Sequence, residues 1–413
     1  MVAETPARPK PSFDEARALI AENAPAPTAV EIALDRALER VTIDPVYAMV
    51  DYPLFDASAM DGFTFDSRLV ACAAEFAPVR LSIGTPIPAG ALLPDPVAGA
   101  AHPISTGAPI PPGCDVVIPK EAAFVSGAVL SLVAPASPGR HIRLRGEDAM
   151  AGDRILEAGC VITPEIIGAL SCYGHARIRV TELPAVTIIS TGAELLGRPG
   201  EHAAHMIFNS NGPMIEAMVS ALRLPARRMP PVRDEMADLM ILLEQIVGDG
   251  VSKVVVSTGG VSAGDHDLLP AALRAIGAVV HFHGVRTRPG KPVLFATLPG
   301  GALFFGLPGN PVAAAVGFRF FVSAAIRSML GLCPEAGTVT PLDVSAREGT
   351  TLILKGRSYA DATGATCVEI REDQRSHTMR PLIEADCWVV ADRMVSGQAR
   401  HRRFPMSGAL IAR

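Results

Sequence analysis

The sequence predicts a multidomain α/β protein in which a mostly parallel sheet is flanked by helices and accompanied by a helical domain and smaller β domains. Two observations lead to this class. The chain has 413 residues, more than one hydrophobic core usually organises, so we expect about two to four domains. Beyond residue 184, short apolar runs alternate with amphipathic segments, a pattern typical of parallel strands joined by helices.

Two helices are predicted in the N-terminal half of the chain. Ser12 and Glu15 have the spacing of a capping box, so the first helix should begin near residue 12. Thr163 followed by Pro164 combines an N-cap with a first-turn proline, and a glycine closes the segment. This pattern predicts the second helix over residues 163–173.

The stretch between these helices has a different sequence pattern. Residues 51–138 contain short apolar runs separated by proline and glycine, with little helical periodicity, which indicates a small β-rich domain. We therefore predict a discontinuous helical domain, residues 1–50 and 139–180, that carries the β-rich domain as an insertion.

Residues 181–330 are predicted to form an α/β domain. Strands are expected at residues 185–190, 253–257, 279–283, 293–297 and 302–306, and helices at residues 213–223, 234–247, 267–276 and 311–330. The helices have lengths that suit crossover connections between parallel strands. One uncharged stretch, residues 292–318, is long enough to cross a bilayer, but its prolines and glycines indicate two strands and a helix instead.

The last region, residues 331–413, is predicted to be a small β domain. Apolar runs at residues 351–354 and 388–391 stand between polar turns and predict strands.

Charge and cysteine usage restrict the partners of the chain. A formal net charge of −5 provides no positive field for nucleic acid or an anionic membrane, so neither is expected as a partner. The seven cysteines form no Cys-x-x-Cys pair, which fits free thiols in a reducing compartment. The N-terminal residues lack the apolar run of a signal peptide. We expect a cytoplasmic protein.

Three glycine-rich bends follow predicted strands of the α/β domain. The first contains Ser190, Thr191 and Gly192, the second Ser257, Gly259, Gly260 and Ser262, and the third Pro308, Gly309 and Asn310. In open α/β sheets, ligands collect beyond the carboxyl ends of the strands, where helix N-termini offer unpaired N–H groups. Taken alone, each bend is better explained as an ordinary strand-to-helix turn. Three together favour a single pocket for an anionic, phosphate-bearing small molecule.

A basic cluster stands beside these bends. Arg286, Arg288 and Lys291 fall within six residues just after a predicted strand. Taken alone, the trio is equally well explained as a solvated edge. Next to glycine bends it can offset two or more negative charges of a ligand.

Several carboxylates stand in turns. Asp265 and Asp267 precede a predicted helix, where only one of them can cap the helix end. A cation-binding or acid–base role is the alternative, with Asp267 as the preferred residue. Asp61, Glu147 and Asp148 lie in glycine-flanked turns, and turn formation explains them equally well.

Six short motifs occur along the chain in a fixed order. They are Ser-Ala-Met-Asp-Gly at 58–62, Ser-Thr-Gly-Ala-Pro at 105–109, Arg-Gly-Glu-Asp at 145–148, Ser-Thr-Gly-Gly-Val-Ser-Ala-Gly at 257–264, Arg-Pro-Gly-Lys-Pro at 288–292 and Leu-Pro-Gly-Asn-Pro at 307–311. Together they resemble the molybdopterin molybdenumtransferase family, which inserts molybdate into adenylylated molybdopterin, and are similar to the E domain of gephyrin. The resemblance implies a pterin-nucleotide site in the parallel-sheet domain and a homodimer that brings the β domain near the partner's site.

The resemblance also implies roles for individual residues. Asp61, Asp148, Glu194 and Asp267 are the implied catalytic residues, and Glu194 and Asp267 are the implied ligands of a Mg²⁺ ion. As substrate-binding residues, the resemblance implies Thr106, Arg143, Lys291 and Ser376, which join Arg288 and the residues of the three bends expected from their position in the sequence. The implied substrates are adenylylated molybdopterin and molybdate, with release of AMP, and an adenylyltransferase is a candidate partner.

Three positions depart from the family pattern. Ala193 and Asn209 stand where the family usually has aspartate, and Arg288 stands where it usually has lysine. Loss of carboxylates weakens a Mg²⁺ site, although Glu194, Asp265 and Asp267 remain. A diverged, non-catalytic pterin-binding or scaffold protein of the same fold is therefore the alternative function.

Overall fold

The computed structural model describes residues 9–90, 92, 97–196, 205–261, 268–340, 342, 349–391 and 401–407. The chain forms two compact units. Met1–Val30 and Val180–Arg413 make one, here called the sheet unit, and Glu31–Arg179 make the other, here called the inserted unit. The finer domain boundaries expected from the sequence stay predictions.

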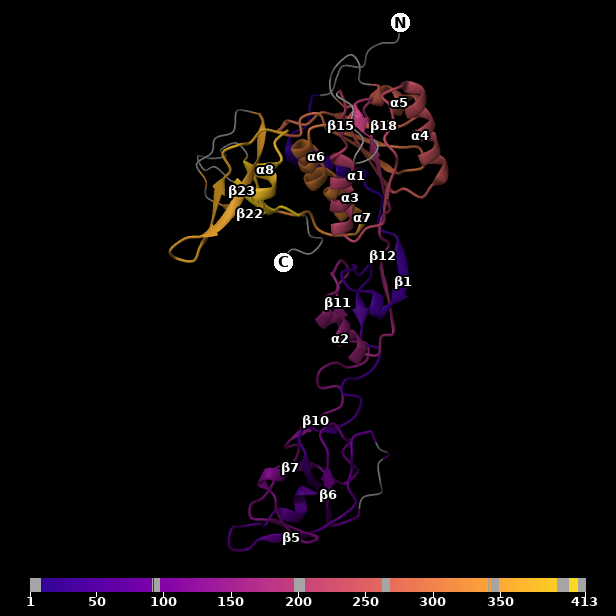
Figure 1. Ribbon diagram of the computed structural model, residues 1–413. Helices are drawn as coiled ribbons and strands as arrows, with labels where there is room; N and C mark the ends of the chain where they lie inside the picture. Colours follow the sequence, from indigo (N-terminus) through magenta and orange to yellow (C-terminus); the bar gives the residue numbers. More distant parts are fainter. Residues whose placement is uncertain are drawn as a thin grey trace. The chain divides into compact units, whose positions relative to one another are not determined.

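The sheet unit is built on a six-stranded sheet with the order β16-β13-β17-β21-β20-β18 (Figure 1). Its strands are β13 (Val186–Ser190), β16 (Ala226–Arg228), β17 (Val254–Thr258), β18 (Val279–His283), β20 (Leu294–Thr297) and β21 (Leu303–Leu307). The four neighbours β16, β13, β17 and β21 are parallel, so the predicted mostly parallel sheet is confirmed. The five strands expected from the sequence lie within one residue of their predicted positions.

One strand of this sheet runs against the others. β20 is antiparallel to both β21 and β18. The turn between β20 and β21 is closed by two hydrogen bonds, from the amide of Leu298 to the carbonyl of Ala302 and from the amide of Gly301 to the carbonyl of Leu298. It is therefore too short for a helical crossover. The chain therefore reverses as a hairpin.

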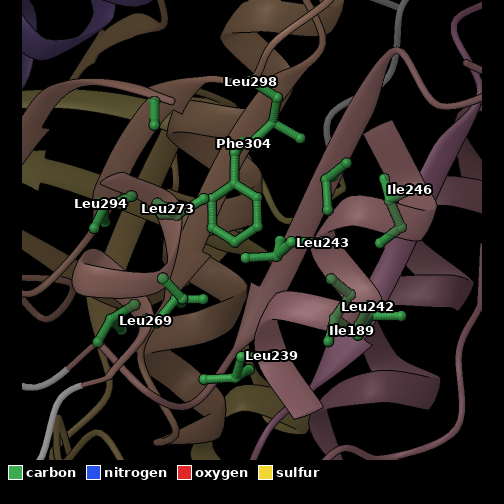
Figure 2. Close-up of a cluster of buried hydrophobic side chains, with 14 residues drawn as sticks. Ile189, Leu239, Leu242, Leu243, Ile246, Leu269, Leu273, Leu294, Leu298 and Phe304 are labelled. Carbon is green, nitrogen blue, oxygen red and sulfur yellow. The ribbon is translucent and has the colours of Figure 1, made fainter. Parts of the chain in front are cut away.

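Helices cover both faces of the sheet. α4 (Met236–Asp249) and α5 (Leu269–Ala275) pack on one face, and α3 (Asn211–Ala221) lies against β13, β16 and α6 on the other (Figure 1). Figure 2 shows the core beneath α4 and α5, where leucines of both helices surround the ring of Phe304. Full burial of each such leucine contributes roughly 1.5–3 kcal/mol, so this cluster holds α4 and α5 against the sheet. α4 ends two residues later than predicted, at Asp249, and its C-cap residue Gly250 adopts a left-handed conformation with φ of 60°.

The long helix predicted over residues 311–330 contains a change of winding. α6 (Pro311–Gly317) and α7 (Ser323–Met329) are joined by a π-helical turn, Phe318–Val322. Among the described helices, Pro311–Met329 is long and apolar enough to cross a membrane, but 83% of its apolar window is buried inside the protein. The expectation of two strands and a helix over residues 292–318 is confirmed by β20, β21 and α6.

A second sheet follows this helix. Its order is β19-β23-β25-β26-β22, with β24 paired to β23. The strands are β19 (Thr287–Arg288), β22 (Thr338–Thr340), β23 (Thr351–Ala360), β24 (Thr366–Ile370), β25 (Cys387–Ala391) and β26 (His401–Pro405), and a short helix, α8 (Arg380–Glu384), precedes β25. Trp388 and Phe404 contact the ring of Phe320 in the π turn. Arg319, which is 2% exposed, forms two hydrogen bonds to Glu335 at 2.7 and 2.8 Å.

The N-terminal helix is present as predicted. α1 (Phe13–Asn23) begins with the capping box of Ser12 and Glu15. The division expected from the sequence groups this helix with residues 139–180, but its contacts place it in the sheet unit. Phe13 is buried there against the rings of Phe320 and Phe321.

The inserted unit is rich in β-structure. Its six-stranded sheet has the order β7-β4-β6-β5-β9-β8. The strands are β4 (Gly62–Phe65), β5 (Val79–Ile83), β6 (Ala100–Ile104), β7 (Val116–Pro119), β8 (Phe124–Ser126) and β9 (Val129–Leu132). Helix α2 (Pro164–Cys172) starts at the predicted N-cap, Thr163.

Short two-stranded ribbons complete the fold. They pair β1 (Ala29–Ala33) with β12 (Arg177–Thr181), β3 (Ala57–Ser58) with β10 (Ile142–Arg143), β2 (Val46–Tyr47) with β11 (Arg154–Leu156), and β14 (Leu195–Leu196) with β15 (Ile207–Phe208). All seven cysteines are free, as expected from their spacing.

Candidate functional site

The three predicted bends lie side by side at one edge of the sheet. They follow β13, β17 and β21, which are adjacent and parallel, and Ser190, Thr258 and Leu307 are aligned in register. The amide of Thr191 donates to the carbonyl of Thr258 at 2.9 Å, and the amide of Gly259 donates to the carbonyl of Leu307 at 3.0 Å. The bends are thus connected to one another.

These hydrogen bonds change the role expected for the backbone amides. The amides of Thr191, Gly192 and Gly259 already donate to carbonyl oxygens of neighbouring loops. The side chains of Ser190, Thr191 and Ser257 are buried, at 0%, 4% and 0% exposure, and the Ser257 hydroxyl has no hydrogen-bond partner in the described part of the chain. The first and second bends therefore pack against each other and form the bottom of the site, here called the floor. They do not offer a row of free N–H donors.

Glycine is required at the second bend because two loops approach closely there. Gly259 and Gly260 have φ values of +91° and +65°. A Cβ on Gly259 would collide with the carbonyl oxygen of Thr191, and one on Gly260 would lie 3.0 Å from the Thr191 hydroxyl. Only glycine accommodates both the left-handed backbone and this contact.

An acidic pair stands beside this floor, and sequence reasoning found only one of its members. The Glu194 carboxylate folds back toward Gly192, with its Oε2 atom 2.7 Å from where a Cβ of that glycine would lie. Asp234 is half-buried, and its Oδ1 atom is buried with no hydrogen-bond partner among the described residues. Burial, and then the negative charge of Glu194, raise the pKa of Asp234. A buried carboxylate oxygen without a hydrogen-bond partner, on which a second negative charge acts, is a site that a cation would complete.

Asn211 connects the start of α3 to the third bend. Its Nδ2 atom donates to the carbonyl of Gly309 at 2.7 Å, and its Oδ1 atom is buried without a partner among the described residues. Asn209, where the family pattern has aspartate, accepts a hydrogen bond from the amide of Gly212 at 3.0 Å. The asparagine thus still caps the first turn of the helix.

A cavity of about 610 Å³ opens at the third bend, next to the basic cluster. Five predicted substrate-binding residues line it, namely Arg288, Lys291, Pro308, Asn310 and Ser376. Asn310 donates from Nδ2 to the hydroxyl of Ser376 at 3.2 Å, which joins the bend to the C-terminal sheet. The lining also includes the hydroxyl-bearing Thr287, whose Oγ1 atom is buried and unpartnered among the described residues. Cations with hydroxyl donors form a receptor for an oxyanion.

The third member of the basic trio has another partner. Arg286 also lines the cavity, but its guanidinium pairs with Glu15 of α1 at 3.3 Å. Its charge is therefore partly neutralised, while no ion pair of Arg288 or Lys291 is found in the part of the chain that the structure describes.

A buried lysine supports one wall of this cavity. Lys355 in β23 is 1% exposed, and its Nζ atom donates to the carbonyl of Arg375 at 3.1 Å. Its backbone N–H and C=O groups both bond the side-chain amide of Gln374. Burial lowers the pKa of the Lys355 ammonium. These bonds hold the segment that presents Ser376.

The inserted unit brings together a separate group of predicted residues. Asp61 accepts hydrogen bonds from the amide and hydroxyl of Thr106, at 2.7 and 2.9 Å, and lies 4.0 Å from the ammonium of Lys120. The two bonds from Thr106 lower the pKa of Asp61. The stretch around Thr106 is joined to β3, since the amide of Gly107 donates to the carbonyl of Ser58.

Asp148 and Arg143 lie in the same unit. Asp148 accepts a hydrogen bond from the phenol of Tyr173 at 2.8 Å. Arg143 is on β10, paired with Ala57 of β3, and its charge acts on the phenol of Tyr52.

Three predicted residues fall outside the described part of the chain: Ser262, Asp265 and Asp267. Within the described residues, no group of three or more His, Cys, Asp and Glu side chains could hold a metal ion. At this edge of the sheet, the negative charge of Glu194 acts on the half-buried carboxyl of Asp234.

Comparisons with known proteins agree with this architecture. Residues 11–174 match the MoeA N-terminal region (domain I and II), and residues 187–328 match a probable molybdopterin binding domain. A molybdopterin biosynthesis MoeA protein from Pyrococcus horikoshii superposes with a TM-score of 0.77 at 25% identity, covering 95% of this chain and 96% of that chain.

The fold and these two matches thus define a multidomain α/β protein of the MoeA type. A molybdopterin molybdenumtransferase of Staphylococcus aureus (strain COL) is 33% identical over 88% of this chain and 87% of its own length. A molybdopterin molybdenumtransferase of Synechococcus elongatus is 33% identical over 90% of this chain and 93% of its own length. The chain belongs to the molybdopterin molybdenumtransferase family, whose place is in molybdenum cofactor biosynthesis.

Proposed function

We propose that this chain inserts molybdate into adenylylated molybdopterin and releases AMP. The observation that carries the proposal is the combination of an acidic pair, Glu194 and Asp234, with a cation-lined cavity at loops that follow neighbouring strands of one sheet. The substrate has two kinds of charge to accommodate, a pyrophosphate group and a molybdate oxyanion. The names of the relatives support the same reaction class.

Arg288 and Lys291 are proposed to hold the oxyanionic groups. Both line the cavity with the hydroxyl of Ser376 near by, and both side chains are exposed to an incoming ligand. Arginine offers two parallel N–H donors, and lysine adds a compact positive charge. Glycine bends at the floor keep bulky side chains away from the ligand.

A Mg²⁺ ion fits the acidic pair. Glu194 and Asp234 would hold it, because the Oδ1 atom of Asp234 is buried without a partner among the described residues and the negative charge of Glu194 acts on the same carboxyl. Asp267 is a third proposed ligand, on its position in the family motif. When bound, the ion would neutralise charge on the phosphate oxygens as the bond to AMP breaks.

The residues of the inserted unit are proposed to act at the same reaction. Asp61 with Thr106, and Asp148 with Tyr173, present carboxylates and donors that suit a polar substrate. We propose that the protein works as a cytoplasmic homodimer, in which this unit serves the partner's substrate. An adenylyltransferase that supplies the adenylylated substrate is the proposed protein partner.

The test is incubation of the purified protein with adenylylated molybdopterin, molybdate and Mg²⁺, with measurement of AMP and of the metallated cofactor. Release of both in equal amounts supports the proposal. Tight binding of the pterin with no AMP would instead favour the non-catalytic scaffold, for which Ala193 and Asn209 are the motivating departures.

Replacement of Lys291 by methionine is expected to weaken molybdate binding about tenfold, or ~1.4 kcal/mol, because one of the cations of the cavity is lost. Equilibrium dialysis with molybdate measures this, and the loss should shrink at high salt. Lys253→Met provides the control, since Lys253 precedes β17 at the other end of the strand. Equal losses in the two variants would contradict the assignment of Lys291.

A further inference from the structure

We propose that Tyr173 is a positioning residue for Asp148, fixing one oxygen of that carboxylate so that the other faces the substrate. The inference rests on the proposed function, since it gives Asp148 a part in the reaction. Tyr173 lies at the end of α2, outside all six motifs. Its phenol donates a hydrogen bond to Oδ2 of Asp148 at 2.8 Å.

The backbone of Asp148 is already held in place. The amides of Asp148 and Ala149 donate to the carbonyl of Tyr52 at 3.1 and 3.2 Å, and the amide of Tyr52 donates back to the carbonyl of Ala149 at 2.8 Å. This small ladder fixes the Cα position but leaves the side chain free to rotate. The Tyr173 hydroxyl is the group that removes this freedom.

Tyr173 is itself rigidly mounted. Its amide closes the last turn of α2 by donating to the carbonyl of Ala169 at 3.0 Å. Its ring packs edge-on against the ring of Tyr52, with centroids 6.0 Å apart and an interplanar angle of 78°. A rigidly held donor fixes its acceptor before the substrate binds. No further side-chain entropy of Asp148 is then lost on binding.

The surroundings of Asp148 leave its second oxygen available. Asp148 is exposed, and no hydrogen bond to its Oδ1 atom is found among the described residues. The charge of Arg143 acts on the phenol of Tyr52, and this phenol forms a hydrogen bond with the side chain of Cys172. Among the described residues, Tyr173 is thus the side chain that donates a hydrogen bond to the carboxylate.

The first experiment measures AMP release by Tyr173→Phe, which keeps the ring and deletes the hydroxyl. We expect kcat/KM to fall about tenfold, chiefly through kcat, because the carboxylate must be ordered at each turnover. Tyr47→Phe makes the same change at an exposed tyrosine of β2 in the same unit and should match the wild type. Full activity of Tyr173→Phe would overturn the inference while leaving the proposed function standing.

A double-mutant cycle separates positioning from an independent role. In an Asp148→Asn background, Tyr173→Phe should change kcat/KM by less than about twofold, because the group it orients is gone. Multiplication of the two single effects would mean that Tyr173 acts on its own and would overturn the inference.

A third measurement does not depend on activity. The hydrogen bond to the carboxylate raises the pKa of Tyr173, because the bond stabilises the protonated phenol. Ultraviolet titration of the tyrosines should therefore show one ionisation moving to lower pH in Asp148→Asn. Unchanged titration would overturn the inference, whereas a wild-type protein that releases no AMP would overturn the proposed function.

Discussion

Replacement of Asp234 by asparagine is expected to lower the rate of AMP release about a hundredfold while changing pterin affinity far less. The reason is that the carboxylate is proposed to hold a cation needed as charge develops on the leaving phosphate, whereas the cavity cations bind the ligand independently. Single-turnover kinetics, with Kd for the pterin measured in parallel, separates the two quantities.

The same substitution is expected to stabilise the protein at neutral pH in the absence of Mg²⁺. Because burial and Glu194 raise the folded-state pKa of Asp234, the folded protein keeps this proton to higher pH than the unfolded chain does. The free energy of unfolding therefore falls as pH rises from the ordinary aspartate range through the raised pKa, and stays lower above it. Asparagine removes that loss, so Tm at pH 7 should rise.

The matched control is Glu235→Gln. Glu235 is adjacent in sequence and exposed, and its carboxylate lies 4.0 Å from Arg233. The same neutralising change there should leave both AMP release and the pH dependence of stability unaltered. If Glu235→Gln slowed the reaction as much as Asp234→Asn, general electrostatics would explain the effect and the cation site would be rejected.

Replacement of Gly259 by alanine is expected to reduce the free energy of unfolding of the sheet unit by about 2–4 kcal/mol. Its φ of +91° disfavours any side chain, and the new Cβ would collide with the carbonyl oxygen of Thr191. Relief of that collision requires the first and second bends to separate, so pterin affinity should fall together with stability. Denaturant unfolding and a binding titration measure the two losses.

Gly309→Ala is the corresponding control in the third bend. At position 309, the Cβ atom of an alanine would have no neighbouring atom within 4 Å, so alanine fits there without strain. Its stability should stay within about 0.5 kcal/mol of the wild type. A large loss at Gly309, or none at Gly259, would contradict the close approach of the two loops.

Much of the sheet unit was predictable because its strands are buried on both faces. β13, β17 and β21 are apolar runs, each followed within two residues by glycine or proline, and the periodicity changes to helical afterwards. β16 was not predicted because Ala-Arg-Arg contains no apolar run and lies at the edge of the sheet. The antiparallel direction of β20 could have been predicted from the sequence. The segment between β20 and β21 is too short for the helical crossover that two parallel strands need.

The site was only partly predictable, for a different reason. Asp234 precedes a helix and resembles an ordinary first-turn acid in the sequence, because its partner Glu194 is forty residues away and only the fold brings them together. The glycines at 259 and 260 were recognised, but their purpose differs, since they permit contact between loops rather than freeing amides for a ligand. The roles of the predicted site residues stay predictions until the variants above are measured.

The buried pair of Arg319 and Glu335 has a practical consequence for any attempt to shorten or recombine this protein. A chain ending before Glu335 would leave the guanidinium without its counter-ion inside the π turn, and would strip Phe320 of the aromatic rings of Trp388 and Phe404. The C-terminal sheet is thus not a detachable module, and a chimera with a relative should exchange the helix and this sheet as one block.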